Sequence, residues 1–416
     1  MNVLIKSATI IDTKSSFHNK TQDILVEKGI IVNIADKIKN PNNYREITFD
    51  NLHISQGWFD SSVSFGEPGY EERETIANGL KVAAKSGFSI VAINANTNPV
   101  IDSNSDVTYL KSKATNNVVD LLPIGALTKE SKGTELAELY DMKSAGAVAF
   151  GDYKKPISNP NLMKVALQYA SNFDGLVCSF PQENAIALNG VMHEYITSTF
   201  IGLKGIPALA EELQIARDLF LLEYTNGKLH IPTISTAKSV ELIRAAKKSE
   251  LDVTCSVAIH NLILTDELLT SFDTNYKVSP PLRSQEDIDA LIAGLKDGTI
   301  DMVTSDHNPL DIELKKIEFD YAAAGTIGLE SAFGALNSIF PTKTTIKFLT
   351  KGKERFGIET ISIEKGSKAN ITLFNPEGTH TFSKDHIHSK SKNSIFEGHQ
   401  LKGNVCGIIN NNKIQL

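Results

Sequence analysis

The sequence predicts an α/β protein built as a (β/α)₈ barrel with a small β-sandwich formed by both ends of the chain. Residues 1–55 read as short strands joined by turns, without helix-length periodicity. From residue 52 onward, buried apolar runs alternate with amphipathic helical stretches, and strand character returns over residues 361–416. We therefore assign residues 56–360 to the barrel, and residues 1–55 together with 361–416 to the sandwich.

The strands expected at the start of the chain are short, and they comprise residues 3–11, 23–26, 29–34 and 46–50. Strand-rich segments that flank a barrel on both sides can bury their faces against each other. We therefore expect the two chain ends to pair into one small domain beside the barrel.

Eight apolar runs are the predicted barrel strands, and they comprise residues 52–59, 88–95, 118–126, 147–150, 175–180, 228–234, 251–259 and 300–305. The predicted helices comprise residues 72–85, 135–144, 162–171, 207–224, 237–248, 285–295 and a last helical region over 331–356. Gly87, Gly146 and Gly175 precede strands, which suits left-handed caps at helix ends. Parallel strands that alternate with helices close into a barrel whose loops after the strands form the functional face. An open doubly wound sheet is the structural alternative.

Composition places the chain among ordinary globular proteins. A net charge of −7 argues against a non-specific nucleic-acid surface. The cysteines, Cys178, Cys255 and Cys406, form no CxxC pair, which indicates a reducing compartment. The first residues lack a signal-peptide pattern, and no segment approaches the ~18 uninterrupted apolar residues of a membrane span. We therefore expect a cytoplasmic protein without nucleic-acid or membrane partners.

Short motifs occur in order along nearly the whole chain. They include Gly57-Trp58-Phe59-Asp60, Glu67-Pro68-Gly69-Tyr70, Asn96-Thr97-Asn98-Pro99, Pro280-Pro281-Leu282-Arg283, Asp306-His307 and Gly328-Leu329-Glu330. Each motif has low specificity alone, but together they make the chain resemble the dihydroorotase family of the amidohydrolase superfamily. The resemblance implies an amidohydrolase-type barrel.

The resemblance also implies a chemistry, which is the hydrolysis or closure of the cyclic amide of dihydroorotate with bound zinc. Zinc lowers the pKa of its bound water to about 7 and polarises the scissile carbonyl. Catalytic zinc sites supply imidazole or carboxylate ligands at ~2 Å. The family takes these ligands from the ends of separate barrel strands: a His-x-His pair, an acidic group or modified lysine, two single histidines and an aspartate.

The histidine positions that the resemblance implies hold other residues in this chain. Ser62 and Ser64 stand where the His-x-His pair belongs, and hydroxyls are weak, neutral zinc ligands. Phe180 and Thr233 stand where the fifth and sixth strands should each supply a histidine. His230 lies three residues before Thr233, and the two-residue period of a strand predicts that it faces the surrounding helices.

The acidic positions are partly kept. After the fourth strand the family's acidic pair is reduced to Asp152 followed by Tyr153, and the sequence does not decide which position would bind metal. Asp306 stands at the end of the eighth strand, where the family uses an aspartate as metal ligand and general base. We interpret Asp306 as a remnant of the catalytic site; the alternative is a hydrogen-bonded carboxylate that holds barrel loops together.

The positions that contact substrate in the family have also changed. Gly66 stands where an arginine should hold the substrate carboxylate, Ser279 where an asparagine should stand, and Leu310 where a histidine should stand. Asn96 is kept and is the remnant of the substrate-binding site. The expected pocket is therefore lined by replaced residues, and we expect neither zinc nor another cofactor.

The sequence thus predicts a catalytically inactive, dihydroorotase-like protein of pyrimidine biosynthesis. The family offers a precedent, because inactive dihydroorotase-like chains in some bacteria assemble with aspartate transcarbamoylase; we expect that partner here, and a homodimer. One alternative is an active dihydroorotase or related cyclic amidohydrolase with an altered metal site that uses Asp152 and Asp306. Another is a protein that binds a small molecule in the emptied pocket through Asn96, Ser62, Ser64 and Thr233.

Overall fold

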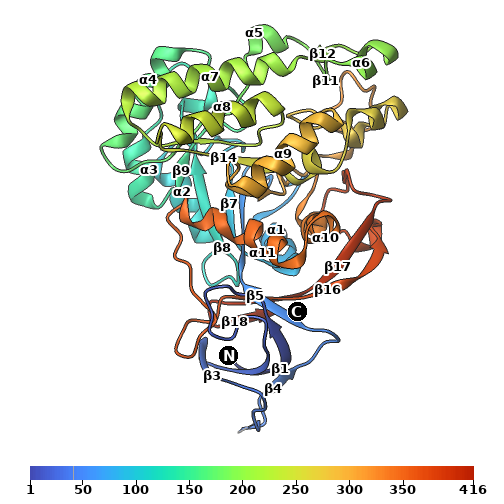
Figure 1. The fold of residues 1–416 in the computed structure, drawn as a ribbon. Coiled ribbons are helices and arrows are strands. Elements are labelled where there is room, and N and C mark those ends of the chain that lie inside the picture. The colour runs from blue at the N-terminus through green and yellow to red at the C-terminus, as the bar shows by residue number, and fades with distance from the viewer. Residues whose placement is uncertain (41) are drawn as a thin grey trace.

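The computed structural model describes residues 1–40 and 42–416, and it confirms a barrel with a second sheet built from both chain ends (Figure 1). The barrel strands are β6 (Trp58–Val63), β7 (Phe88–Ile93), β8 (Asp120–Gly125), β9 (Ala149–Phe150), β10 (Val177–Cys178), β13 (Leu229–Ile231), β14 (Val253–Ala258) and β15 (Met302–Thr304). They are neighbours in this order, and every pairing between them is parallel.

The first and last barrel strands are joined, so the open doubly wound alternative is wrong. Val63 at the end of β6 forms a parallel bridge with His307, just beyond β15. The Ser64 backbone N–H donates to the His307 carbonyl oxygen at 2.7 Å. Closure places the carboxyl ends of the strands around one shared opening.

The helices that cover the barrel follow the strands in sequence. They are α1 (Ile76–Lys85), α2 (Asn104–Lys113), α3 (Leu139–Ala145), α4 (Pro160–Ser171), α7 (Ala208–Thr225), α8 (Ala237–Lys248), α9 (Gln285–Asp297), α10 (Leu329–Ile339) and α11 (Thr342–Lys351). The N-terminal caps of α1 and α9 explain where these two helices begin. The Thr75 side chain accepts from the Asn78 N–H, and Ser284 forms a capping box with Asp287. The predicted helical region over 331–356 consists of more than one helix, because Pro341 separates α10 from α11.

The first predicted strand, over residues 52–59, is divided between the two sheets. β5 (His53–Gln56) belongs to the sheet of the chain ends, and β6 begins the barrel at Trp58. Gly57 lies between them, and a Cβ there would fall 1.9 Å from the Asn370 side-chain oxygen. Only glycine allows this close approach of backbone and side chain.

The second sheet combines β1 (Asn2–Ile10), β2 (Thr21–Glu27), β3 (Ile30–Ala35), β4 (Arg45–Ile47) and β5 with β16 (Ile371–Thr381), β17 (Gln400–Asn410) and β18 (Lys413–Gln415). β5 is the junction, since it pairs parallel with β1 and antiparallel with β16. Ile54, Ile371 and Ile409 share an apolar core with residues of β1 and β2. This core is separate from the core of the barrel.

The predicted glycine caps are correct at two positions of three. Gly87 and Gly146 have φ values of 90° and 107°, in the left-handed region. The prediction for Gly175 is wrong, because Asp174 takes the left-handed conformation there, with φ of 56°.

Within residues 1–40 and 42–416, no helix has the length and apolar character needed to cross a membrane.

Candidate functional site

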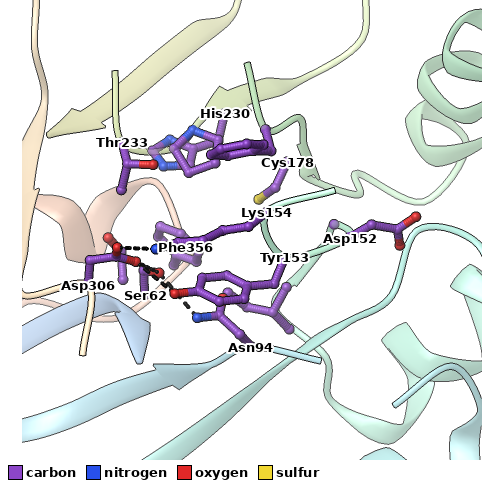
Figure 2. Close-up of a pocket in the computed structure, with 15 residues that line it drawn as sticks. Ser62, Asn94, Asp152, Tyr153, Lys154, Cys178, His230, Thr233, Asp306 and Phe356 are labelled. Atoms are coloured by element: carbon purple, nitrogen blue, oxygen red, sulfur yellow. Dashed lines mark hydrogen bonds and ion pairs between the residues drawn. The ribbon is translucent and has the colours of Figure 1, made fainter. Parts of the chain in front are cut away.

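A small cavity of about 40 Å³ lies at the carboxyl ends of the barrel strands (Figure 2). Of the positions predicted from the sequence, those that line this cavity are Ser62, Asp152, Phe180, Thr233 and Asp306. Ser64, Gly66, Asn96, Ser279 and Leu310 are not among the lining residues. The barrel therefore brings together most of the positions implied for metal ligands, but not those implied for substrate contacts.

Asp306 is the centre of the polar contacts in the cavity. Its backbone is in the left-handed region, with φ of 48°, and its N–H donates to the Thr304 hydroxyl at 3.1 Å. One carboxylate oxygen accepts from the Ser62 hydroxyl at 3.2 Å and from the Tyr153 hydroxyl at 3.1 Å. The other oxygen accepts from the Lys154 ammonium at 2.7 Å. Both oxygens of this buried carboxylate are therefore engaged.

Lys154 supplies the positive charge at this site. The loop after β9 turns at Lys154, with φ of 53°, and Figure 2 shows the side chain extended toward Asp306. The Lys154 and Asp306 side chains are 13% and 2% exposed, so the two charges face each other largely out of water. A buried charge without a partner is strongly destabilising, which is why the two groups depend on each other. We did not predict a role for Lys154 from the sequence. The signal that could have indicated it was the presence of a basic residue directly after Tyr153.

Tyr153 is a neutral hydrogen-bond donor in this arrangement. Burial, together with the negative charge of Asp306, raises the pKa of the Tyr153 phenol well above its ordinary value. The phenol therefore stays protonated and donates a hydrogen bond to the Asp306 carboxylate.

Asp152 points away from the cavity centre in Figure 2. Its carboxylate accepts from the Leu127 N–H at 2.9 Å, from the Thr128 N–H at 3.1 Å and from the Thr128 hydroxyl. Burial raises the pKa of Asp152 against these hydrogen bonds. Asp152 thus holds the loop after β8, while Tyr153 occupies the position that faces Asp306.

Two further polar residues complete the site, and we predicted no role for either of them from the sequence. The Asn94 amide donates to the hydroxyls of Ser62 and Ser64, at 3.1 and 3.2 Å. Asp60 is buried in β6 and accepts from the Ser62 N–H, the Ser305 N–H and the Thr304 hydroxyl. Burial raises the pKa of Asp60. The bonds of Asp60 join the first barrel strand to the last, and the Asn94 amide holds the hydroxyls of both serines.

His230 lines the cavity, so the prediction that it faces the surrounding helices is wrong. Its neighbours there include Cys178 and Phe356, and its Nδ1 lies 3.0 Å from the Thr254 hydroxyl. β13 ends at Ile231 and Thr233 has φ of 50°, so the two-residue period of the strand does not extend from His230 to Thr233. Burial lowers the pKa of His230 to about 3, which makes it a neutral imidazole.

One of the altered substrate positions, Gly66, has a steric reason in this chain. A Cβ at Gly66 would lie 1.7 Å from the Tyr70 carbonyl oxygen, so no side chain fits where the family places its arginine. The Leu310 N–H donates to the Asn393 side-chain oxygen at 3.1 Å. Ser279 precedes a cis peptide bond to Pro280. The Asn96 side-chain oxygen is buried without a hydrogen-bond partner in the described part of the chain.

The groups around Asp306 do not fit zinc. Zinc sites take thiolate, imidazole or carboxylate ligands, usually three or more from the protein. Asp306 has two hydroxyls and one ammonium as neighbours, and an ammonium repels a dication. Across residues 1–40 and 42–416, no group of three or more His, Cys, Asp or Glu side chains is arranged to hold a metal ion.

The cavity is also small for a cyclic substrate. A water molecule needs about 10–15 Å³, so the cavity of about 40 Å³ has room for about three waters. The side chains of Lys154 and Tyr153 lie in it beside Asp306 (Figure 2).

Comparison with known proteins places the chain among amidohydrolases. A family model described as dihydro-orotase-like matches residues 53–239. The dihydroorotase of Pelotomaculum thermopropionicum is 40% identical over 97% of this chain and 96% of its own length. That of a Thermoanaerobacter species is 43% identical over 98% and 96%. Among solved structures, the L-hydantoinase of Arthrobacter aurescens shares the fold with a TM-score of 0.85 at 20% identity, covering 99% of this chain and 95% of its own.

Proposed function

The chain belongs to the dihydroorotase family of the amidohydrolase superfamily, and from that premise we propose that it is a non-catalytic member. Its role would be that of a structural or regulatory subunit in pyrimidine biosynthesis, in the cytoplasm, with aspartate transcarbamoylase as its partner. The observation that supports the loss of catalysis is the ion pair between Lys154 and Asp306.

The ammonium of Lys154 opposes metal binding at Asp306. Two unit charges about 4 Å apart interact by about 4 kcal/mol at an effective dielectric constant of 20, so a dication beside a retained ammonium meets about 8 kcal/mol of repulsion. A metal would therefore have to displace the ammonium from Asp306. The displaced ammonium would then lose its buried partner.

The arrangement also opposes general-base catalysis by Asp306. A general base needs a free lone pair within hydrogen-bond reach of the proton that it removes. The Asp306 oxygens accept from Ser62, Tyr153 and Lys154, and the first two donors share one oxygen. Of the about four lone-pair sites of a carboxylate, one remains, on the oxygen that faces Lys154, so a water molecule would have to share that oxygen with the ammonium.

A metal assay combined with a dihydroorotase assay tests the loss of catalysis. Freshly purified protein should carry far less than one equivalent of zinc and should turn over dihydroorotate no faster than the Asp306→Ala variant. One equivalent of retained zinc, with turnover that Asp306→Ala abolishes, would instead establish the alternative: an active amidohydrolase with an altered metal site.

The partner is tested separately, by affinity purification of the tagged chain from its native extract. Aspartate transcarbamoylase should co-elute in a fixed ratio, and the same ratio should appear when the two purified proteins are mixed. A chain that elutes without the transcarbamoylase in both experiments contradicts this partner. That outcome would leave the conclusion about catalysis intact.

A further inference from the structure

A second cavity, of about 300 Å³, lies away from the carboxyl ends of the barrel strands. Its walls are the segment that follows β1, the end of β5 and one side of α11, which lies on the side of the barrel nearest the sheet of the chain ends (Figure 1). Sites for small molecules have volumes of about 300–1,000 Å³, and this cavity reaches the lower end of that range. Among the described residues, it shares no lining residue with the cavity at Asp306. We call it the α11 cavity.

Lysine side chains gather on the side of α11 that faces this cavity. Lys343, Lys347 and Lys351 are four residues apart, so they lie on one face of the helix at intervals of about 6 Å. α11 contains no aspartate or glutamate, and within residues 1–40 and 42–416 none of these three ammonium groups has an ion pair. Like charges four residues apart destabilise a helix, and a bound anion would remove that cost.

The carboxylates at the α11 cavity do not neutralise its lysines. Asp12 is buried and accepts from the Gln56 amide at 3.0 Å and from the Ile363 N–H at 2.9 Å. Glu354 pairs with Lys14 at 3.9 Å, but both side chains are more than half exposed, and such surface pairs contribute little. Four lysines against two carboxylates leave an excess of two positive charges at this cavity, in a chain whose net charge is −7.

Hydroxyl groups and apolar surface complete the α11 cavity. Thr13, Thr344 and Thr360 line it with hydroxyls that can donate hydrogen bonds. Ile11 and Ile346 provide apolar contacts, and the aliphatic stems of the lysines extend that surface. A ligand that matches this lining has several negative charges at one end and an uncharged organic part at the other. Phosphoryl groups have the required charge, and their oxygens accept strong hydrogen bonds from ammonium groups.

We propose that the α11 cavity binds a phosphorylated small molecule of the size of a nucleoside diphosphate. The phosphoryl groups lie along Lys343, Lys347 and Lys351, whose flexible stems let neighbouring ammonium groups hold one diphosphate. The organic part of the ligand lies against Ile11 and Ile346. This inference does not rest on the proposed function, because an active enzyme and an inactive subunit would both carry this cavity.

Isothermal titration calorimetry of the full chain with adenosine, cytidine, guanosine and uridine diphosphates tests the site. At least one of these diphosphates should bind with a Kd below about 1 mM, and inorganic pyrophosphate should bind at least about 10-fold more weakly. The corresponding nucleoside should not bind, because it lacks the charge that the lysines recognise. The proposal is wrong if none of the diphosphates binds, if the nucleoside binds equally well, or if pyrophosphate binds as tightly as the nucleotide.

Lys347→Glu tests the role of the lysine face. The variant places a carboxylate between Lys343 and Lys351 and should weaken binding of the nucleotide by at least about 100-fold. The new carboxylate can pair with both lysines, so the ligand-free variant should unfold at an unchanged or higher temperature, which separates lost binding from lost folding. Lys296→Glu is the matched control: Lys296 is an exposed lysine in the last turn of α9, and its variant should bind like the wild type. Binding to Lys347→Glu at the affinity of the wild type would overturn the proposal.

Glu354→Gln tests the sign of the charge effect. The variant removes a carboxylate from the α11 cavity and frees Lys14, so it should tighten nucleotide binding by about 3- to 10-fold. This gain should shrink as the salt concentration rises, because both side chains are exposed and ions screen their charges. A change that merely disturbs the cavity would weaken binding. Weaker binding by Glu354→Gln would therefore contradict the placement of the phosphoryl groups among these lysines.

Discussion

Replacing Lys154 with methionine removes the ammonium that faces Asp306 and keeps a side chain of similar length. At the observed 2.7 Å, the gross attraction of the pair is about 6 kcal/mol at an effective dielectric constant of 20. The cost of removing both charges from water offsets a large part of this attraction. Removing one partner leaves the Asp306 carboxylate buried with hydroxyl donors alone. We expect Lys154→Met to lower the free energy of unfolding by about 3 kcal/mol, the lower end of the range for a broken buried pair.

Urea unfolding of four proteins measures this effect: the wild type, Lys154→Met, Asp306→Asn and the double variant. The double variant should be more stable than the sum of the single effects predicts, with a coupling energy of about 2 kcal/mol, because it leaves no unpaired charge. Far-ultraviolet circular dichroism confirms that each variant is folded before unfolding. A coupling energy below about 0.5 kcal/mol would refute the idea that Lys154 is the resident cation of the barrel.

Two further predictions concern stability. Gly66→Arg, which restores the arginine of the family, should lower the free energy of unfolding by about 3 kcal/mol, since its Cβ meets the Tyr70 carbonyl; thermal unfolding unchanged within a degree or so would contradict the steric reason. His260 is buried with a pKa of about 3, below its ordinary 6.5, so the unfolded chain binds a proton in this window that the native chain does not. The free energy of unfolding should therefore fall as pH decreases from 6.5 toward 3, and His260→Asn should reduce that slope by up to about 1.4 kcal/mol per pH unit; an unchanged slope would exclude His260 as a source.

The sequence predicted the barrel well because its strands are nearly continuous apolar runs and its main helices are strongly amphipathic. It missed α2, which buries only Val107 and Leu110 and is otherwise polar, so its helical period is weak. It also joined β5 to β6, because hydropathy does not show that Gly57 carries the chain from one sheet to the other.

The site was predictable where the position along a strand end decides what faces the cavity, as for Ser62, Thr233 and Asp306. It was not predictable where a local backbone conformation decides. The left-handed turn at Lys154 directs a long side chain inward, and a similar turn at Thr233 ends the alternation that predicted an outward His230. Neither conformation has a signature in these non-glycine residues.

The position of β5 between β1 and β16 has a consequence for synthesis of the protein. β5 leaves the ribosome early, but the strand that completes its hydrogen bonding is more than 300 residues further along the chain. At about 5–20 residues per second, the edge of β5 stays open for on the order of tens of seconds. An open edge is a template for pairing with other chains. Nascent chains that stop before Ile371 should therefore be bound by chaperones or aggregate, even when their barrel sequence is complete.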